Sequence, residues 1–383
     1  MNDLAIYIHW PFCQSKCPYC DFNSHVHSSI DQEAWLDAYL KQINEYANII
    51  KNHNITSVFF GGGTPSLMPV HTVAKIIDKL LTINSFHNSI EITLEANPTS
   101  VESNKFIGFK AAGINRVSIG IQSFNEVDLK FLGRAHSKTE AIDALKIANK
   151  VFDNYSFDLI YARPNQTVNA WQQEMLEAVQ YAKNHLSLYQ LSIEKGTQFY
   201  QLYQKKKFTI PNQDLAADLY ILTNDFMMEH GLEAYEISNY ATIPSFQSQH
   251  NLSYWRYNQY LGIGPGAHSR IFIEEKPHAM VMLHDPQIWL KNISKKKSPV
   301  QQKTLLTPQE ILYEYMIMGL RINEGVNLTK LKRLLGHPVN NVLNAKALHD
   351  LCLKNYIIHD QYTIALTTQG RLLLNSIVEQ IIN

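Results

Sequence analysis

The 383-residue sequence has little of what secreted and membrane-spanning proteins require. It has only four cysteines: Cys13, Cys17 and Cys20 crowd into one short segment, and Cys352 lies far away. This distribution excludes the disulfide framework of a small secreted domain. No segment approaches the roughly 20 consecutive apolar residues that cross a bilayer, and the first residues lack a signal-peptide pattern. We therefore expect a soluble, cytoplasmic protein with clustered, reduced thiols that favour metal binding.

A net charge is also missing. The 34 basic and 34 acidic side chains give a formal charge of +0, so no general attraction to nucleic acid or to anionic membranes is expected. With 45% hydrophobic residues, the chain can bury a core as one large or two ordinary domains. Ligands must therefore be bound at local sites.

The first 240 residues alternate short β-branched or aromatic runs with amphipathic segments of helical length. This alternation predicts an α/β fold with a parallel sheet, either an open doubly wound sheet or an incomplete barrel. Ligands bind at the carboxyl ends of the strands in both architectures. The predicted strands are 4–8, 57–60, 91–94, 116–121, 156–160 and 187–193, and the helices between them are 31–50 (with Asp31 as N-cap), 70–83, 101–112, 139–151 and 167–184.

The pattern changes after Asn239. We expect a helix at 215–230, a further strand at 235–237 and a solvated linker at 293–299, and hence domains at 1–240, 241–303 and 304–383. The last of these has the helix and hairpin order of a winged helix, with predicted helices at 308–322, 328–335, 341–353 and from 369. Its second helix carries Lys330, Lys332 and Arg333, which we interpret as solvated charges, so nucleic acid is not an expected partner.

The loop after the first strand has the spacing Cys13-x3-Cys17-x2-Cys20. Short spacings let three thiolates converge on one metal centre. Iron–sulfur clusters normally take four thiolates, so three would leave one iron open to chelate a ligand. The alternative is a structural zinc site completed by His9, His25 or His27.

Polar groups follow several of the other strands. The Gly61-Gly62-Gly63-Thr64 segment lacks β-carbons and would expose backbone amides to a ligand. Glu95, Gln122 and Asp158 each come at the end of a strand. One carboxylate at such a position is normally a helix cap. Several polar side chains at the ends of neighbouring strands, facing the same opening, favour a binding site.

These motifs carry a resemblance. The cysteine spacing with Tyr19, followed by Gly61-Gly62-Gly63-Thr64-Pro65, resembles the radical S-adenosylmethionine (SAM) superfamily. The segments 7–13, 17–24 and 158–161 resemble the oxygen-independent coproporphyrinogen III oxidase family, over nearly the whole chain. The resemblance implies an incomplete (β/α)6-type barrel with a small α+β, winged-helix-like C-terminal domain.

It also implies cofactors. A 4Fe–4S cluster would bind Cys13, Cys17 and Cys20, and its open iron would chelate SAM, whose reductive cleavage yields an adenosyl radical. We expect Asp158 to meet the ribose and Arg134 the carboxylate. The positions matching SAM contacts in that family are Tyr7, Tyr19, Gly62, Gly63, Thr64, Glu95, Gln122, Arg134, Asp158 and His268.

Two departures separate the chain from the oxidases. These have a fourth cysteine where this chain has Phe22, and an amino-terminal arm before the first strand. Both features resemble the HemW branch, regarded as haem chaperones without oxidase activity. The segment His250-Asn251-Leu252-Ser253-Tyr254-Trp255 matches the H-N-x-x-Y-W haem motif of that branch, with His250 as axial ligand and aromatic rings against the macrocycle. The alternative is that His250 hydrogen-bonds in the core and Trp255 merely packs.

The resemblance thus implies binding of haem and its transfer to acceptor (respiratory) haemoproteins, with membrane contact only through an acceptor. Oxidative decarboxylation of coproporphyrinogen III is the enzymatic alternative, and a winged-helix regulator with a sensing cluster is a third. A homodimer stays open. The chain departs from its relatives at Ala162-Arg163, where they have glycine and leucine. Alanine would resist a left-handed backbone there, and Arg163 is a candidate partner for a propionate or for the SAM carboxylate.

Overall fold

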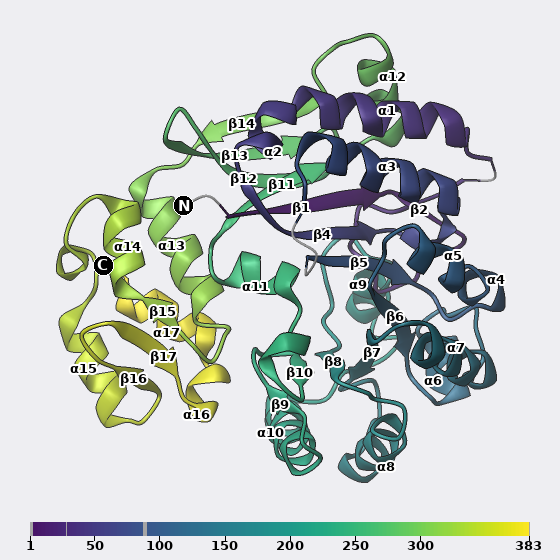
Figure 1. The fold of residues 1–383 in the computed structure, drawn as a ribbon. Coiled ribbons are helices and arrows are strands. Elements are labelled where there is room, and N and C mark those ends of the chain that lie inside the picture. The colour runs from purple at the N-terminus through teal and green to yellow at the C-terminus, as the bar shows by residue number, and fades with distance from the viewer. Residues whose placement is uncertain (1–2, 28, 87–89, 383) are drawn as a thin grey trace.

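The fold is built on one twelve-stranded sheet. In the computed structural model, which describes residues 3–27, 29–86 and 90–382, its strand order is β14-β13-β12-β11-β1-β4-β5-β6-β7-β8-β10-β9 (Figure 1). The six predicted strands lie consecutively and in parallel within it. They are β1 (Asp3–Trp10), β4 (Asn54–Gly62), β5 (Glu91–Ala96), β6 (Arg116–Gln122), β7 (Asn154–Tyr161) and β8 (His185–Gln190).

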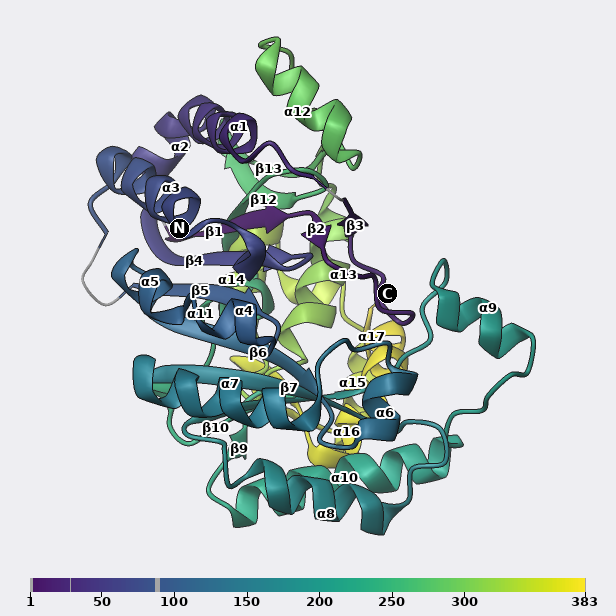
Figure 2. The ribbon, with the colours of Figure 1, turned by 90° about the vertical axis from the view of Figure 1, so that its right-hand side faces the viewer.

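These strands are nearly continuous apolar runs because both of their faces are covered. In β1, for example, six of the eight residues are buried, which is typical of parallel strands between layers. Helices pack on the outer face of the sheet (Figure 2). They are α1 (Gln32–Glu45), α2 (Ala47–Lys51), α3 (Val70–Ile83), α4 (Ser100–Ser103), α5 (Phe106–Ala111), α6 (Glu126–Phe131), α7 (Lys138–Val151), α8 (Val168–Ala178) and α10 (Gln213–Glu229).

Local signals define the helix starts. Asp31 caps α1, as predicted, by accepting a hydrogen bond from the backbone of Ala34. Ser137 and Glu140 form a capping box at the start of α7. Two predicted helices are each split in two, 31–50 into α1 and α2 and 101–112 into α4 and α5.

The sheet is open, because β14 and β9 are edge strands that do not pair with each other. The expected incomplete barrel is confirmed. Residues after 240 extend the sheet by β11 (Gln259–Ile263), parallel to β1, and then by the antiparallel strands β12 (His268–Ile273), β13 (Lys276–Met282) and β14 (Val300–Leu305). The segment 241–303 therefore belongs to this sheet. The lysine-rich turn 294–298 is exposed, but it connects α12 (Pro286–Ser294) to β14 within the same sheet.

The strand expected at 235–237 is wrong. The strands here are β9 (Glu233–Ala234) and β10 (Asn239–Ala241), which flank that segment. Glu236 is fully buried, and its carboxylate accepts hydrogen bonds from the Ser238 backbone (2.7 Å) and from Asn239 Nδ2 (2.5 Å). The chain turns here because a buried carboxylate needs these donors.

The C-terminal unit has its own core and lies beside the sheet (Figure 1). Its elements follow the expected winged-helix order: α13 (Pro308–Gly319), β15 (Val326–Asn327), α14 (Leu328–Leu335), α15 (Ala345–Leu353), β16 (Ile357–His359), β17 (Thr363–Leu366), α16 (Thr368–Arg371) and α17 (Leu374–Ile381).

Lys330 is not the solvated charge that the sequence suggested. Its Nζ donates to the Arg256 carbonyl and to Asn258 Oδ1 (2.8 Å), and burial lowers its pKa to about 8. It joins α14 to the turn after α11 (Gln249–Trp255). Across the described residues, no helix is both long and apolar enough to span a bilayer.

Candidate functional site

A closed loop presents the three clustered cysteines. The strands β2 (Phe12–Cys13) and β3 (His25–Val26) pair with each other and bring the ends of the loop together. Phe12 is buried edge-on against Trp10 and Trp35, which anchors the first end. Lys16 Nζ donates to the Ser24 carbonyl across the loop (3.2 Å).

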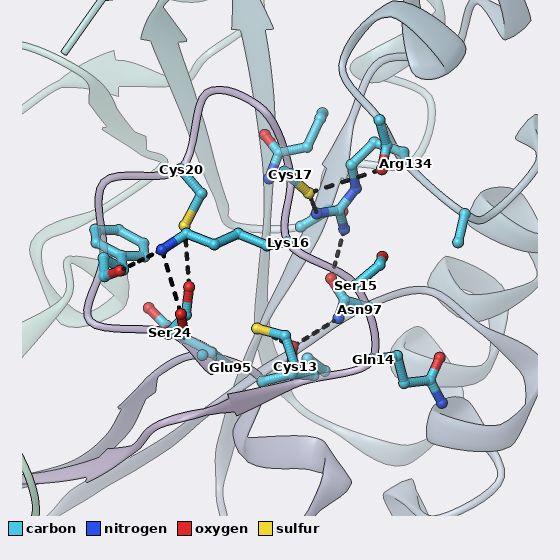
Figure 3. Close-up of a pocket in the computed structure, with 18 of the residues that line it drawn as sticks. Cys13, Gln14, Ser15, Lys16, Cys17, Cys20, Ser24, Glu95, Asn97 and Arg134 are labelled. Atoms are coloured by element: carbon cyan, nitrogen blue, oxygen red, sulfur yellow. Dashed lines mark hydrogen bonds between the residues drawn. The ribbon is translucent and has the colours of Figure 1, made fainter. Parts of the chain in front are cut away.

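The thiols of Cys13, Cys17 and Cys20 line one cavity of about 160 Å³, here called the cysteine cavity (Figure 3). All three are free and half-buried. Thr64 Oγ1 donates to Cys13 Sγ (3.4 Å), and Arg134 Nη1 donates to Cys17 Sγ (3.5 Å). Burial raises the pKa of the Cys13 thiol. Three unoxidised sulfurs with hydrogen-bond donors beside them are a donor set that fits an iron–sulfur cluster.

The histidines of the zinc alternative face elsewhere. His9 Nε2 is hydrogen-bonded to the Asn23 carbonyl (2.9 Å), and its Nδ1 to the Tyr7 hydroxyl (3.0 Å). His25 Nε2 is hydrogen-bonded to Asn23 Oδ1 (3.0 Å), and His27 contacts the Phe12 ring edge-on. None of the three lines the cysteine cavity. Within the described ranges, no three His, Cys, Asp or Glu side chains are arranged to hold a single metal ion.

Polar groups from the strand ends form the opposite wall of the cysteine cavity. The predicted Glu95, Gln122 and Asp158 lie here together, with Gly62, Gly63, Thr64 and Tyr19. Arg134, from the loop after α6, donates through Nη2 to Asn97 Oδ1 (2.5 Å) and to the Gly120 carbonyl (2.6 Å). Its Nε is buried and has no acceptor among the described residues.

Two buried carboxyls lie in this wall. Burial, and secondarily the charge of Asp158, raises the pKa of Glu95 to about 8, although the Gly62 amide donates to it (3.1 Å). Burial likewise raises the pKa of Asp158 to about 6, against a hydrogen bond from Ser118 Oγ (3.4 Å). Glu95 is therefore mostly protonated at neutral pH. A cationic ligand would favour the ionised form of both groups.

The glycine segment differs from the expectation. Its amides are already engaged, because Gly62 N donates to Glu95, Gly63 N to the Trp10 carbonyl (2.7 Å) and Thr64 N to the Phe12 carbonyl (2.9 Å). A Cβ on Gly63 would lie 2.7 Å from the Phe12 carbonyl oxygen. The glycines are thus needed for the close approach of β4 to the cysteine loop, rather than to leave amides free for a ligand.

A second, larger cavity of about 670 Å³ adjoins the first and is here called the aromatic cavity. Gly62, Glu95 and Phe22 line both cavities. Two of the predicted SAM residues, Tyr7 and His268, lie here and not in the cysteine cavity. The aromatic cavity lies between the sheet and α13, and its aromatic lining is Tyr7, Phe22, Tyr254, Trp255, Tyr257 and Tyr260.

His250 is buried, with 1% of its surface exposed. Its Nδ1 is hydrogen-bonded to Ser57 Oγ (2.8 Å), its Nε2 to the Tyr254 hydroxyl (2.7 Å), and its ring stacks on Phe59 with centroids 4.8 Å apart. Burial lowers its pKa to about 3. It lines a polar interior cavity of about 310 Å³ together with Asn251. Neither ring nitrogen is free in this arrangement.

Arg163 is in neither cavity, so its suggested contact with a propionate or the SAM carboxylate is wrong. Its guanidinium is 2% exposed and pairs with Glu174 and with Asp128 (3.2 Å). A buried guanidinium needs such partners. The preceding Ala162 has a φ of 56°, which is the left-handed conformation that alanine disfavours.

Two further residues organise the site and were not singled out from the sequence. Asn97 donates to Thr64 Oγ1 (3.0 Å) and accepts from Arg134, which connects two strand ends. Asn23 Nδ2 donates to the Pro265 (3.1 Å) and His284 (2.9 Å) carbonyls, which ties the cysteine loop to the loops of the aromatic cavity. Their positions in the sequence could have pointed to them, because Asn97 lies two residues after the strand-end Glu95 and Asn23 lies within the cysteine loop.

Comparison with known proteins gives a consistent set of similarities. The family model for the radical SAM superfamily matches residues 7–178, and that for the HemN C-terminal domain matches residues 306–373. The chain is 32% identical to the radical S-adenosyl methionine domain-containing protein 1, mitochondrial, of Danio rerio (99% of this chain, 87% of that one). It is 33% identical to the heme chaperone HemW of Haemophilus influenzae (98% and 97%). The solved structure of coproporphyrinogen III oxidase (HemN) from Escherichia coli superposes with a TM-score of 0.81 at 20% identity, over 99% of this chain and 89% of that one.

Proposed function

Because this chain belongs to the radical SAM superfamily, and within it to the family of its HemW relatives, we propose that it is a haem chaperone. It carries a 4Fe–4S cluster, binds SAM and haem, and hands the haem to acceptor haemoproteins such as those of respiration. The observation that carries the proposal is the junction of two unlike cavities. A cavity lined by three thiols and buried acids adjoins one with aromatic walls, and Phe22, Gly62 and Glu95 line both.

The cysteine cavity supports the cluster and SAM assignments. Cys13, Cys17 and Cys20 would hold the cluster, which when loaded supplies one-electron chemistry to SAM. Glu95 and Asp158 would attract a ligand that bears positive charge, because each gains an ionised partner by binding it. Among the described residues, the Nε of Arg134 has no acceptor, so it could donate to a carboxylate. Tyr19, Gly62, Gly63, Thr64 and Gln122 complete the same walls.

The aromatic cavity supports the haem assignment. Its volume lies within the range of about 300–1,000 Å³ typical of small-molecule sites, and six aromatic side chains line it, which suits a macrocycle. Tyr254 and Trp255, from the motif that begins at His250, are among them. Oxidative decarboxylation of a coproporphyrinogen remains the second candidate, favoured by the overall fold shared with the oxidase. Phe22 replaces the fourth cysteine of the oxidases in the wall that the two cavities share.

Anaerobic reconstitution with iron and sulfide, followed by haem titration, tests the proposal. We expect absorbance typical of a 4Fe–4S cluster and saturable binding of one haem, which is then released to an apo-haemoprotein. Conversion of coproporphyrinogen III in the presence of SAM and a reductant would instead support the oxidase. Bound zinc without iron–sulfur absorbance would contradict the cluster assignment.

A further inference from the structure

Two histidines of the aromatic cavity have so far been given no role in haem binding, although one of them, His268, is among the positions expected to contact SAM. His268 is the first residue of β12, and His284 follows β13 in the turn before α12. Both are exposed and line the aromatic cavity. Their ring centroids lie 6.4 Å apart, and the described residues offer neither imidazole a hydrogen-bond partner. The pair thus differs from His250, whose two nitrogens are both engaged.

Free imidazoles on an aromatic cavity suit haem iron. Neutral histidine is a common axial ligand. The observed separation of their centroids, 6.4 Å, places both rings within reach of one metal ion.

The rest of the cavity matches the other parts of the macrocycle. Tyr254 and Tyr260 pack edge to face with centroids 4.6 Å apart, which gives a rigid apolar wall. Arg270 lines the same cavity and pairs with Glu314 (2.7 Å). A propionate could share this guanidinium at the polar end. The indole nitrogen of Trp255 is buried without an acceptor among the described residues.

We propose that the haem bound by this chain lies in the aromatic cavity with its iron ligated from the His268–His284 pair, and that His250 is a positioning residue. The inference rests on the proposed function and deepens it. His250 holds the Tyr254 hydroxyl and is itself held by Ser57, so it sets the angle of one cavity wall. Asn23 fastens the cysteine loop to the carbonyl of His284, so the iron site and the cluster site share one rigid connection.

A second cavity lined by histidines is an alternative haem site and provides the control. A cavity of about 560 Å³ in the C-terminal unit is lined by His349 and His359 together with Cys352. Its other walls are largely aliphatic and include no aromatic ring besides the two imidazoles, so it lacks stacking faces for a macrocycle.

The test is a titration of the full-length chain with ferric haem and, separately, with metal-free protoporphyrin IX, read out by absorbance. For the H268A/H284A variant we expect at least a tenfold loss of haem affinity and loss of the spectrum of imidazole-ligated iron, with metal-free protoporphyrin bound as in the wild type. Free imidazole should restore the spectrum. The H349A/H359A variant should behave as the wild type.

Three different outcomes would overturn the assignment. If the wild type shows no saturable haem binding, the proposed function fails and the assignment fails with it. If the wild type binds haem and H268A/H284A retains both its affinity and its imidazole spectrum, the assignment alone fails. Loss of the spectrum in H349A/H359A would move the ligand to the C-terminal unit. Because both substituted pairs include exposed histidines, thermal melts should show all of these variants folded.

Discussion

The cysteine loop and the segment His250–Trp255 both contain residue types that bind metals, but they differ in where these side chains point. The loop is tied at its two ends, so its three sulfurs face a cavity. The His250 segment is part of the short helix α11, which packs on β4 and turns its imidazole into the core. A ligand in a tied loop is presented to a cavity, whereas a ligand on a packed helix is oriented by whatever the helix packs against. The same residue chemistry therefore has two different uses.

The largest expected effect is the loss of iron when one thiol of the cysteine cavity is removed. Cys17→Ala removes one of three sulfurs from the cysteine cavity, so reconstituted iron should fall at least tenfold because two thiolates cannot hold the cluster. Chemical analysis of iron and sulfide, together with the visible spectrum, measures the cluster content. Cys352→Ala is the matched control, since Cys352 is far from this cavity, and it should load normally. Equal loading of both variants would contradict the cluster assignment.

The buried ligand should behave as a structural residue. His250→Ala leaves the hydroxyls of Ser57 and Tyr254 without their partner and opens a cavity beside Phe59. We expect the free energy of unfolding to fall by about 2–4 kcal/mol, measured by denaturant titration. His71→Ala, at an exposed position on α3, should change it by no more than about 0.5 kcal/mol. An unchanged stability in His250→Ala would mean that its hydrogen bonds are not formed in solution.

The carboxyls of the cysteine cavity predict a pH dependence. The pKa of Glu95 is raised from 4.5 to about 8, so its contribution to stability is fully present below pH 4.5 and is lost as the pH rises through 8. The loss is at most about 1.4 kcal/mol per pH unit. Glu95→Gln should therefore flatten the decline in stability between pH 6.5 and 9, a window above the titration of Asp158 near 6. Glu229→Gln, on the exposed end of α10, should keep the wild-type slope.

The smallest expected effect concerns backbone strain at the residue that follows β7. Ala162 directly follows β7 and has a left-handed conformation, so Ala162→Gly should stabilise the chain by up to about 1 kcal/mol. Ala170→Gly in α8 is the control, because glycine in an exposed helix costs about 0.5–1 kcal/mol. A higher unfolding midpoint for Ala162→Gly and a lower one for Ala170→Gly would support backbone strain at Ala162. Shifts of both midpoints in the same direction would contradict it.

Much of the large sheet could be predicted from the sequence. Each of the six parallel strands is an apolar run bounded by turn residues, and the helices between them have clear periodicity and caps, as at Asp31. The strands that extend this sheet after residue 240, β11 to β14, were not predicted, although the hairpin of the C-terminal unit was. The residues of β12, β13 and β14 are partly exposed and pair antiparallel, so they follow no crossover pattern, as the mixed burial of β13 shows. The segment around Glu236 was mistaken for a strand because its pattern does not reveal the buried carboxylate that turns it.

The candidate site divides in the same way. The sequence by itself determined the positions that need only local order: the cysteine spacing, the acids at the strand ends and the glycines beneath them. Parallel strands bring their carboxyl ends to one edge, so such residues meet whatever the details of packing. Only the tertiary structure decided where Arg163, His250 and His268 lie. Their environments depend on contacts between segments far apart in the chain. Those contacts buried two of these side chains with partners and left the third facing a cavity.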